Sequence, residues 1–208
     1  MLTSRYGWGE TIVDALSTLL VAGLEDEFLL ALNHTVHIDF TESNGLVNPF
    51  ETIIRYAISN VTFPYYSYVG SIVSTIDLLE FFPNAPKVEP DLIQKLRRQA
   101  EVLVHKLSPG FGLVLAESEA RLDSPTRMWF PRVDFQSSRG VSQQIWGETE
   151  ILLAETGTNF LEYGRLSELC LDEQYVNNVY PSETALISRQ RRPGGRLFGL
   201  KWNPGFPG

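Results

Sequence analysis

The sequence predicts an all-α fold, in which pairs of helices form hairpins and long irregular loops connect them. Three observations favour this fold class: apolar residues recur with helical periodicity in the clearest segments, alternating strand patterns are scarce, and proline and glycine clusters separate the helical segments. Of the 208 residues, 43% are hydrophobic and 12% are aromatic, which is typical of a folded domain rather than a disordered chain. The length fits one domain or a piece of a larger one.

Helix signals begin near the start of the chain. A one-sided apolar stripe, spaced like the buried face of a helix, runs along Ile12, Val13, Leu16, Leu19 and Leu20. Gly23 follows, where a glycine with a left-handed backbone commonly ends a helix. A second, shorter helix is expected over 25–32, with acidic residues in its first turn. Asn48 as N-cap and Pro49 at the first helical position predict a third helix that runs through Tyr56.

The middle of the chain contains one ambiguous segment and one clear helix. Residues 63–77 combine aromatic and β-branched residues, so a strand and a buried helix both fit. A loop is expected over 83–90. The most regular apolar periodicity in the chain predicts a helix over 92–107. Residues 112–147 show little periodicity and read as a long irregular connection, with a short strand at 133–135.

The C-terminal part is expected to be helical and then irregular. Residues 148–169 predict a second long helix, although Thr156 to Asn159 are poor helix formers. Residues 173–190 predict a further helix that is interrupted at Pro181. The segment 193–208 is rich in glycine and proline and is expected to be an irregular tail.

Charge and cysteine content exclude several functional classes. Lys and Arg number 17 against 25 Asp and Glu, a net charge of −8, so the basic field that nucleic-acid binding needs is missing. Cys170 is the single cysteine, so no internal disulfide and no cysteine-rich zinc module can form. His34, His37 and His105 are too scattered for a histidine metal site. No stretch approaches the roughly 18 to 20 apolar residues of a membrane span, and no signal-peptide pattern is visible.

Two groups of carboxylates are candidates for chemistry. Glu51 follows Asn48 by three residues, which fits a capping box, and Arg55 lies one turn later, which fits a surface ion pair. The functional alternative is a carboxyl group in a pocket, tuned by the guanidinium. Glu155, Thr158 and Glu162 share one stripe of their predicted helix, which fits either a solvated face or a functional wall.

Asn33 and Asn60 begin Asn-x-Thr sequons, which would accept N-glycans if the chain enters the secretory pathway. No glycine-rich phosphate loop, nucleophile elbow or His-Glu-x-x-His motif occurs. The absence of these motifs argues against nucleotide enzymes, serine hydrolases and zincins.

Four blocks in order resemble glycoside hydrolase family 47, the class I α-1,2-mannosidases, in their fungal type. The most specific block is Asn48-Pro49-Phe50-Glu51-Thr52-Ile53-Ile54-Arg55-Tyr56. Three further blocks are similar to the family's first helix, its Asp-x-Pro-Thr segment and its Ala-Glu-x-Gly-Thr segment, and they lie at 11–28, 123–135 and 154–169.

The resemblance implies a fold and a reaction. The family fold is an (αα)7 barrel of paired helices, of which this chain would form a part. The family removes terminal α-1,2-linked mannose from high-mannose N-glycans with inversion, using Ca²⁺ that touches the sugar. By match, Glu51 is the proton-donating acid, Arg55 the arginine beside it and Glu155 a glutamate lining the substrate cavity.

The resemblance also implies what the chain contains and where it acts. Residues 1–208 would be the N-terminal part of a single catalytic domain, with segments 57–68 and 112–122 as insertions. The family's candidate bases and its calcium-binding threonine belong to blocks that are absent from these residues, so this polypeptide alone is expected to be inactive. Its partners would be high-mannose N-glycans or glycoproteins of the secretory pathway (endoplasmic reticulum, Golgi or secreted), with membrane association only through a segment outside this sequence.

Two alternatives remain open at this stage. The first is a non-catalytic mannose-recognition protein, like the degradation-enhancing branch of the same family that acts in glycoprotein quality control. The second is an unrelated all-α interaction domain, which would bind neither carbohydrate nor calcium.

Overall fold

The computed structural model describes residues 8–53, 67–114, 127–141, 144–145, 148–149, 151–190 and 201–202. These residues form a mostly helical molecule with short two-stranded antiparallel ladders. The all-α prediction is thus confirmed for most of the described chain and wrong for the ladders. No helix in these ranges is long and apolar enough to cross a membrane.

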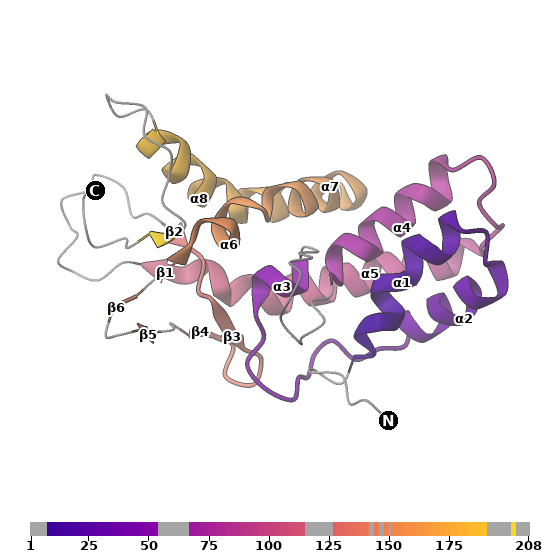
Figure 1. The fold of residues 1–208 in the computed structure, drawn as a ribbon, viewed down its shortest axis with the longest axis horizontal. Helices are drawn as coiled ribbons and strands as arrows, with labels where there is room; N and C mark the ends of the chain where they lie inside the picture. Colours follow the sequence, from indigo (N-terminus) through magenta and orange to yellow (C-terminus); the bar gives the residue numbers. More distant parts are fainter. Residues whose placement is uncertain are drawn as a thin grey trace.

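The helices follow one another in chain order as α1 (Glu10–Val21), α2 (Glu25–Thr35), α3 (Pro49–Ile53), α4 (Val69–Phe81), α5 (Pro90–Leu107), the 3-10 helix η1 (Ser108–Gly112), α6 (Leu153–Gly157), α7 (Phe160–Cys170) and α8 (Gln174–Gln190). The ladders pair β1 (Leu113–Val114) with β2 (Arg127–Met128), β3 (Arg132–Asp134) with β4 (Arg139–Val141), β5 (Gln144–Ile145) with β6 (Glu148–Thr149), and β7 (Ile151–Leu152) with β8 (Lys201–Trp202). Figure 1 shows α1, α2 and α4 at one end of the molecule and the ladders at the other, with α3 between them.

The N-terminal helices agree with the predicted periodicity. In α1 the buried apolar residues are Val13, Leu16 and Leu20, whereas Ile12 is 40% exposed and lies off the buried face. Gly23 has φ +70, the left-handed conformation expected after the end of a helix. The second helix, α2, continues to Thr35, beyond the predicted end.

The ambiguous middle segment is a helix where it is described. In α4 the apolar residues Val69, Ile72, Val73 and Ile76 are buried at the spacing of one helical face, so the period of 3.6 decides against a strand. The residues 63–66 lie outside the described residues. The predicted helix of the central region is confirmed as α5, which has Pro90 at its first position.

The C-terminal expectations need three corrections. The predicted long helix over 148–169 is wrong, because its start forms strands and the rest is divided at Thr158 and Asn159 into α6 and α7. The predicted interruption at Pro181 is also wrong, since α8 continues through that residue. Within the expected irregular tail 193–208, the described pair Lys201–Trp202 forms a strand with β7. The short strand predicted near residue 133 is confirmed as β3.

The loop between α2 and α3 is held firmly against the core. The ring of Trp8 meets the rings of Phe40 and Tyr68 edge to face, with centroids 5.1 and 5.3 Å apart. The side-chain amide of Gln99 in α5 donates hydrogen bonds to the carbonyls of Val36 and Ile38, at 2.9 and 3.0 Å. These contacts fix the chain that leads into α3.

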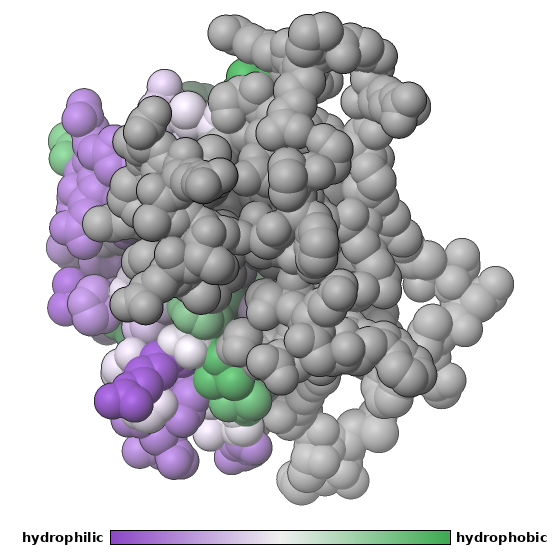
Figure 2. All heavy atoms as spheres, turned by 90° about the vertical axis from the view of Figure 1, so that its left-hand side faces the viewer, coloured by the Kyte–Doolittle hydropathy of each residue, from purple (hydrophilic) through white to green (hydrophobic). Residues whose placement is uncertain are grey.

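Large apolar side chains that remain exposed are scattered over several elements. Leu30 in α2, Phe81 in α4 and Leu161 in α7 are more than two-thirds exposed. In Figure 2, the coloured residues that can be seen lie mainly along the left side and are mostly hydrophilic, with a small hydrophobic group near the bottom. Single exposed apolar residues of this kind are normal on protein surfaces.

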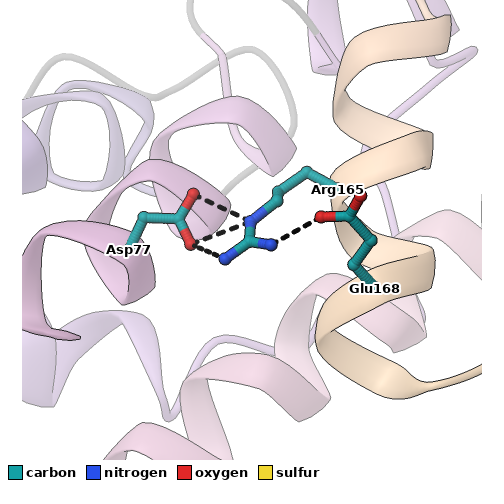
Figure 3. A network of polar contacts seen from close by, with 3 residues as sticks. All are labelled: Asp77, Arg165 and Glu168. Atoms are coloured by element: carbon teal, nitrogen blue, oxygen red, sulfur yellow. Dashed lines mark hydrogen bonds and ion pairs between the residues drawn. The ribbon is translucent and has the colours of Figure 1, made fainter. Parts of the chain in front are cut away.

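An arginine clamp joins α4 to α7. Figure 3 shows the guanidinium of Arg165 between the carboxylates of Asp77 and Glu168. Its Nε and Nη2 donate to Asp77 Oδ1 at 3.0 and 2.8 Å, a two-pronged contact, and Nη1 donates to Glu168. Hydrogen bonds to Asp77 and then to Glu168 raise the pKa of Arg165 above its ordinary value. The clamp holds α7 in place over α4.

Replacing Arg165 with alanine is expected to lower the free energy of unfolding by about 1 kcal/mol, because the pair is partly exposed and solvent screens it. Urea unfolding of R165A, D77A and the double variant would measure a coupling of about 0.5–1 kcal/mol that shrinks as salt is added. A coupling energy of zero at low salt would contradict the clamp.

Candidate active site

Glu51 lies in the first turn of α3 and is half-buried. The side-chain Oδ1 of buried Asn48 accepts a hydrogen bond from the backbone N–H of Glu51, at 3.3 Å. The Asn48 carbonyl accepts from the N–H and the hydroxyl of Thr52, at 3.1 and 2.8 Å. The N-cap role predicted for Asn48 is therefore confirmed, and it fixes the backbone of Glu51.

The end of α3 is tied to the start of α4. The Thr52 carbonyl accepts the N–H of Tyr68 at 2.9 Å, and the Ile53 carbonyl accepts the hydroxyl of Ser67 at 3.0 Å. Gly70 lies so close that an added Cβ would be 3.1 Å from the Ile53 carbonyl and 2.6 Å from Ser67 Oγ. A residue without a side chain is needed there for α3 to sit against α4.

Glu155 is brought beside α3 although the two are far apart in the sequence. Glu155 is half-buried in α6, which packs against α3. It lines a small cavity whose other walls are Asn48, Pro49, Phe50, Trp129, Phe130 and Pro131. Asn48, Pro49 and Phe50 immediately precede Glu51. Two of the predicted site residues, Glu51 and Glu155, therefore lie on the neighbouring helices α3 and α6.

The poor helix formers after Glu155 have a structural role. The hydroxyl of Thr158 donates to the Ala154 carbonyl at 2.7 Å, and the side-chain amide of Asn159 donates to the Glu155 carbonyl at 3.0 Å. These bonds satisfy carbonyls that the end of α6 would leave open. They hold the backbone of Glu155 in place.

Three buried carboxylate or amide oxygens lack hydrogen-bond donors in the described part of the chain; one is Oε2 of Glu183 in α8, and the other two follow Glu155 in the sequence. The latter two are Oδ1 of Asn159, which is fully buried, and Oε2 of Glu162 in the first turn of α7. Glu162 packs over Gly70, with its Cγ 3.7 Å from where a Gly70 Cβ would lie. Burial raises the pKa of Glu162 above its ordinary value. Buried polar atoms are normally paired, but both of these atoms are almost wholly inaccessible, so a ligand could reach them only if neighbouring side chains moved.

The raised pKa of Glu162 predicts a pH-dependent stability. Since the folded-state pKa exceeds the unfolded one, the stability that this group contributes is present below the unfolded pKa and lost as pH rises through the folded pKa. E162Q is therefore expected to be more stable than the wild type at pH 7, by about 1 kcal/mol or less because the carboxyl is partly exposed.

Urea unfolding at pH 7 and pH 4 would measure this gain, which should vanish at pH 4. The exposed Glu89 serves as the control, and E89Q is expected to change stability at neither pH. An E162Q variant that is less stable than the wild type at pH 7 would contradict the burial effect.

Aromatic rings form the wall next to these acceptors. Tyr163 is fully buried, with its ring centroid 5.9 Å from that of Trp129 and 5.3 Å from that of Phe111. Both contacts are edge to face. Since Trp129 also lines the Glu155 cavity, the cavity has carboxylate and aromatic walls.

The other predicted site residues are placed apart or not placed. Arg55 and Asn60 lie outside the described residues. Asn33 is exposed in the last turn of α2, whereas the Thr35 hydroxyl of its sequon is buried and donates to the Ala31 carbonyl at 2.8 Å. The sequence interpretation groups Glu162 with Glu155 but does not select it as a site residue.

The described residues do not fit a calcium site. Among them, no group of three or more His, Cys, Asp or Glu side chains comes together to hold a metal ion.

Glycosidases carry out hydrolysis with a pair of carboxyl groups, and here the fold brings two candidate carboxyl groups onto adjoining helices. Comparisons with known proteins agree. Residues 2–203 match the sequence profile of glycosyl hydrolase family 47. The chain belongs to this glycosidase family.

Similar proteins are fungal α-1,2-mannosidases. A mannosyl-oligosaccharide alpha-1,2-mannosidase of Penicillium citrinum is 32% identical over 187 residues, covering 90% of this chain and 31% of that protein. A probable mannosyl-oligosaccharide alpha-1,2-mannosidase 1B of Aspergillus fumigatus is 32% identical over 197 residues, covering 95% and 34%. The solved α-1,2-mannosidase from Trichoderma reesei superposes with a TM-score of 0.69 at 28% identity, covering 88% of this chain and 33% of that one. The chain thus spans about a third of the length of these relatives.

Proposed function

We propose that this chain supplies one side of an α-1,2-mannosidase site that removes terminal α-1,2-linked mannose from high-mannose N-glycans with inversion. The observation that supports this most strongly is the packing of α6 against α3, which brings Glu155 beside the residues that lead into Glu51 across a cavity of about 10 Å³, room for about one water molecule. The helices would form part of an (αα)7 barrel, with the cavity wall turned toward the sugar.

Glu51 is the proposed acid. It donates a proton through a water to the oxygen of the leaving sugar, as one of the two carboxyl groups that an inverting glycosidase needs. Arg55, one turn further on, is proposed to tune its pKa. Glu155 is proposed to accept hydrogen bonds from mannose hydroxyls through its carboxylate.

The second carboxyl group is not assigned within these 208 residues. In an inverting reaction it activates a water on the opposite face of the sugar. By resemblance, the candidate bases and the calcium-binding threonine would belong to blocks outside these 208 residues. The polypeptide by itself is therefore expected to bind mannose without hydrolysing it.

The proposed setting is the secretory pathway, where high-mannose glycoproteins are made. The acidic net charge of −8 fits a neutral glycan partner better than nucleic acid.

Calorimetric titration with α-1,2-linked mannobiose tests the proposal. Glu155→Ala is expected to weaken binding by at least about tenfold, because a hydrogen bond to a charged group contributes roughly 1.5–3 kcal/mol. The matched control is E89A, which removes an exposed carboxylate on α5's N-terminal flank. Equal affinities of the wild type and E155A would overturn the assignment of Glu155.

A further inference from the structure

A second and larger hollow lies at the C-terminal end of α2. We call it the α2–α3 groove; its walls are the end of α2, the loop 36–44, Lys106 of α5 and the turn after β3. Its volume is about 1090 Å³, slightly above the range of roughly 300–1,000 Å³ that is typical of ligand sites. We propose that this groove binds a second, uncleaved branch of a neutral mannose oligosaccharide; the identity of the sugar rests on the proposed function.

The groove is lined mainly by groups that can bind hydroxyls. Exposed amides from three segments face it, those of Asn33, Asn44 and Gln136. In the part of the chain that the structure describes, no hydrogen bond engages these three side-chain amides. Each offers donors and acceptors in one plane, which matches adjacent hydroxyl groups on a sugar ring.

The charges in the groove favour a neutral ligand. Asp39 and Glu42 lie in the same lining as Lys106, so the formal charges of the groove nearly cancel. The two carboxylates would repel a phosphate or sulfate. A bound metal ion is disfavoured because the described residues contain no cluster of ligating side chains. An uncharged molecule with many hydroxyl groups could form hydrogen bonds with these side chains without burying a charge of its own in the groove.

The groove is formed before any ligand arrives. The indole Nε1 of Trp8 donates to the Glu42 carbonyl at 2.8 Å, across the base of the loop. Asp39 Oδ1 accepts the N–H and hydroxyl of Thr41, at 2.9 and 2.6 Å. These bonds hold Asp39 in one orientation and lower its pKa, so it stays an ionised acceptor. A preformed loop loses little entropy when it binds.

The groove and the Glu155 cavity are built on the same two segments. The loop that lines the groove continues to Val47, whose N–H and carbonyl pair with Val133 of β3 at 2.9 and 2.8 Å. Pro131, just before β3, lines the Glu155 cavity, and Gln136, just after β3, lines the α2–α3 groove. The groove and the cavity are therefore built on adjoining parts of the same two paired segments.

The test is a titration of the ¹⁵N-labelled 208-residue protein with α-1,2-linked mannobiose, using bacterial protein in which Asn33 carries no glycan. The side-chain amide signals of Asn33, Asn44 and Gln136 are expected to shift. The double variant N44A/Q136A should weaken groove binding by at least about fivefold. Its matched control is Gln94→Ala on the exposed surface of α5, which should change nothing.

This experiment distinguishes binding in the α2–α3 groove from binding at Glu155. Glu155→Ala is expected to remove the shifts in α6 and leave those in the groove. Shifts confined to α3 and α6 would overturn the groove while the proposed function stands. No shift in the groove up to saturating sugar, or equal shifts with cellobiose, would also overturn it.

Discussion

Replacing Glu51 with glutamine is expected to lower mannose release by about 10²–10⁴-fold, the usual contribution of a general acid. The assay needs a complete domain, because this chain covers only 31% of the Penicillium citrinum mannosidase to which it is similar. A fusion in which this chain replaces the matching part of that enzyme supplies one. Glutamine keeps the shape of the side chain, and the Asn48 cap uses the backbone N–H of residue 51, which the substitution retains. The loss of activity therefore measures the loss of the acidic proton.

The control is Glu89→Gln in the same fusion, which should retain full activity. Proton NMR would follow the anomer released, and β-mannose should appear first if the configuration is inverted. A folded E51Q fusion that releases mannose as fast as the unmodified fusion would contradict the acid role. A folded fusion that binds mannobiose but never releases mannose would instead favour the mannose-recognition alternative.

Replacing Gly140 with alanine is expected to lower the free energy of unfolding by about 3 kcal/mol, because overpacking forces bulky neighbours aside. A Cβ at Gly140 in β4 would overlap the ring atoms Cγ and Cδ2 of Phe130. Phe130 lines the cavity with Glu155, so the displaced ring should also weaken mannobiose binding. Thermal unfolding and calorimetry on the same variant would measure both effects.

Gly164 provides the matched glycine control. It lies inside α7, and a Cβ there would meet no atom within 4 Å. Because alanine is the better helix former, G164A is expected to gain about 0.5–1 kcal/mol. If G140A and G164A changed stability in the same direction, the close packing of Phe130 on β4 would be contradicted.

Local sequence signals are sufficient to predict an element whose structure depends only on its own residues. The apolar periodicity of α5 and the Asn48 cap of α3 need no distant partner, and the sequence predicts both. The two-residue strands cannot be predicted in this way, because the pairing of Ile151–Leu152 with Lys201–Trp202 depends on contacts between remote segments. Poor helix formers mark a weak point near Asn159, but they do not show that the helix ends there.

The candidate site is only partly readable from the sequence. Spacing alone favours a capping role for Glu51, and the resemblance to a family, not periodicity, selects Glu51 and Glu155 as site residues. Glu162 is not selected, because its burial against Gly70 is a property of the packed fold. From the sequence alone, a carboxylate on a polar stripe is predicted to be exposed to solvent, because the helix that packs over it is not known.

The central claim is that these residues hold mannose beside an acid but do not complete the hydrolysis. Proton NMR of α-1,2-linked mannobiose mixed with the purified 208-residue protein tests this in one sample. The predicted result is line broadening from binding, reduced in E155A, with no free mannose formed over time. Release of mannose that disappears in E51Q would contradict the claim, and so would the absence of any binding.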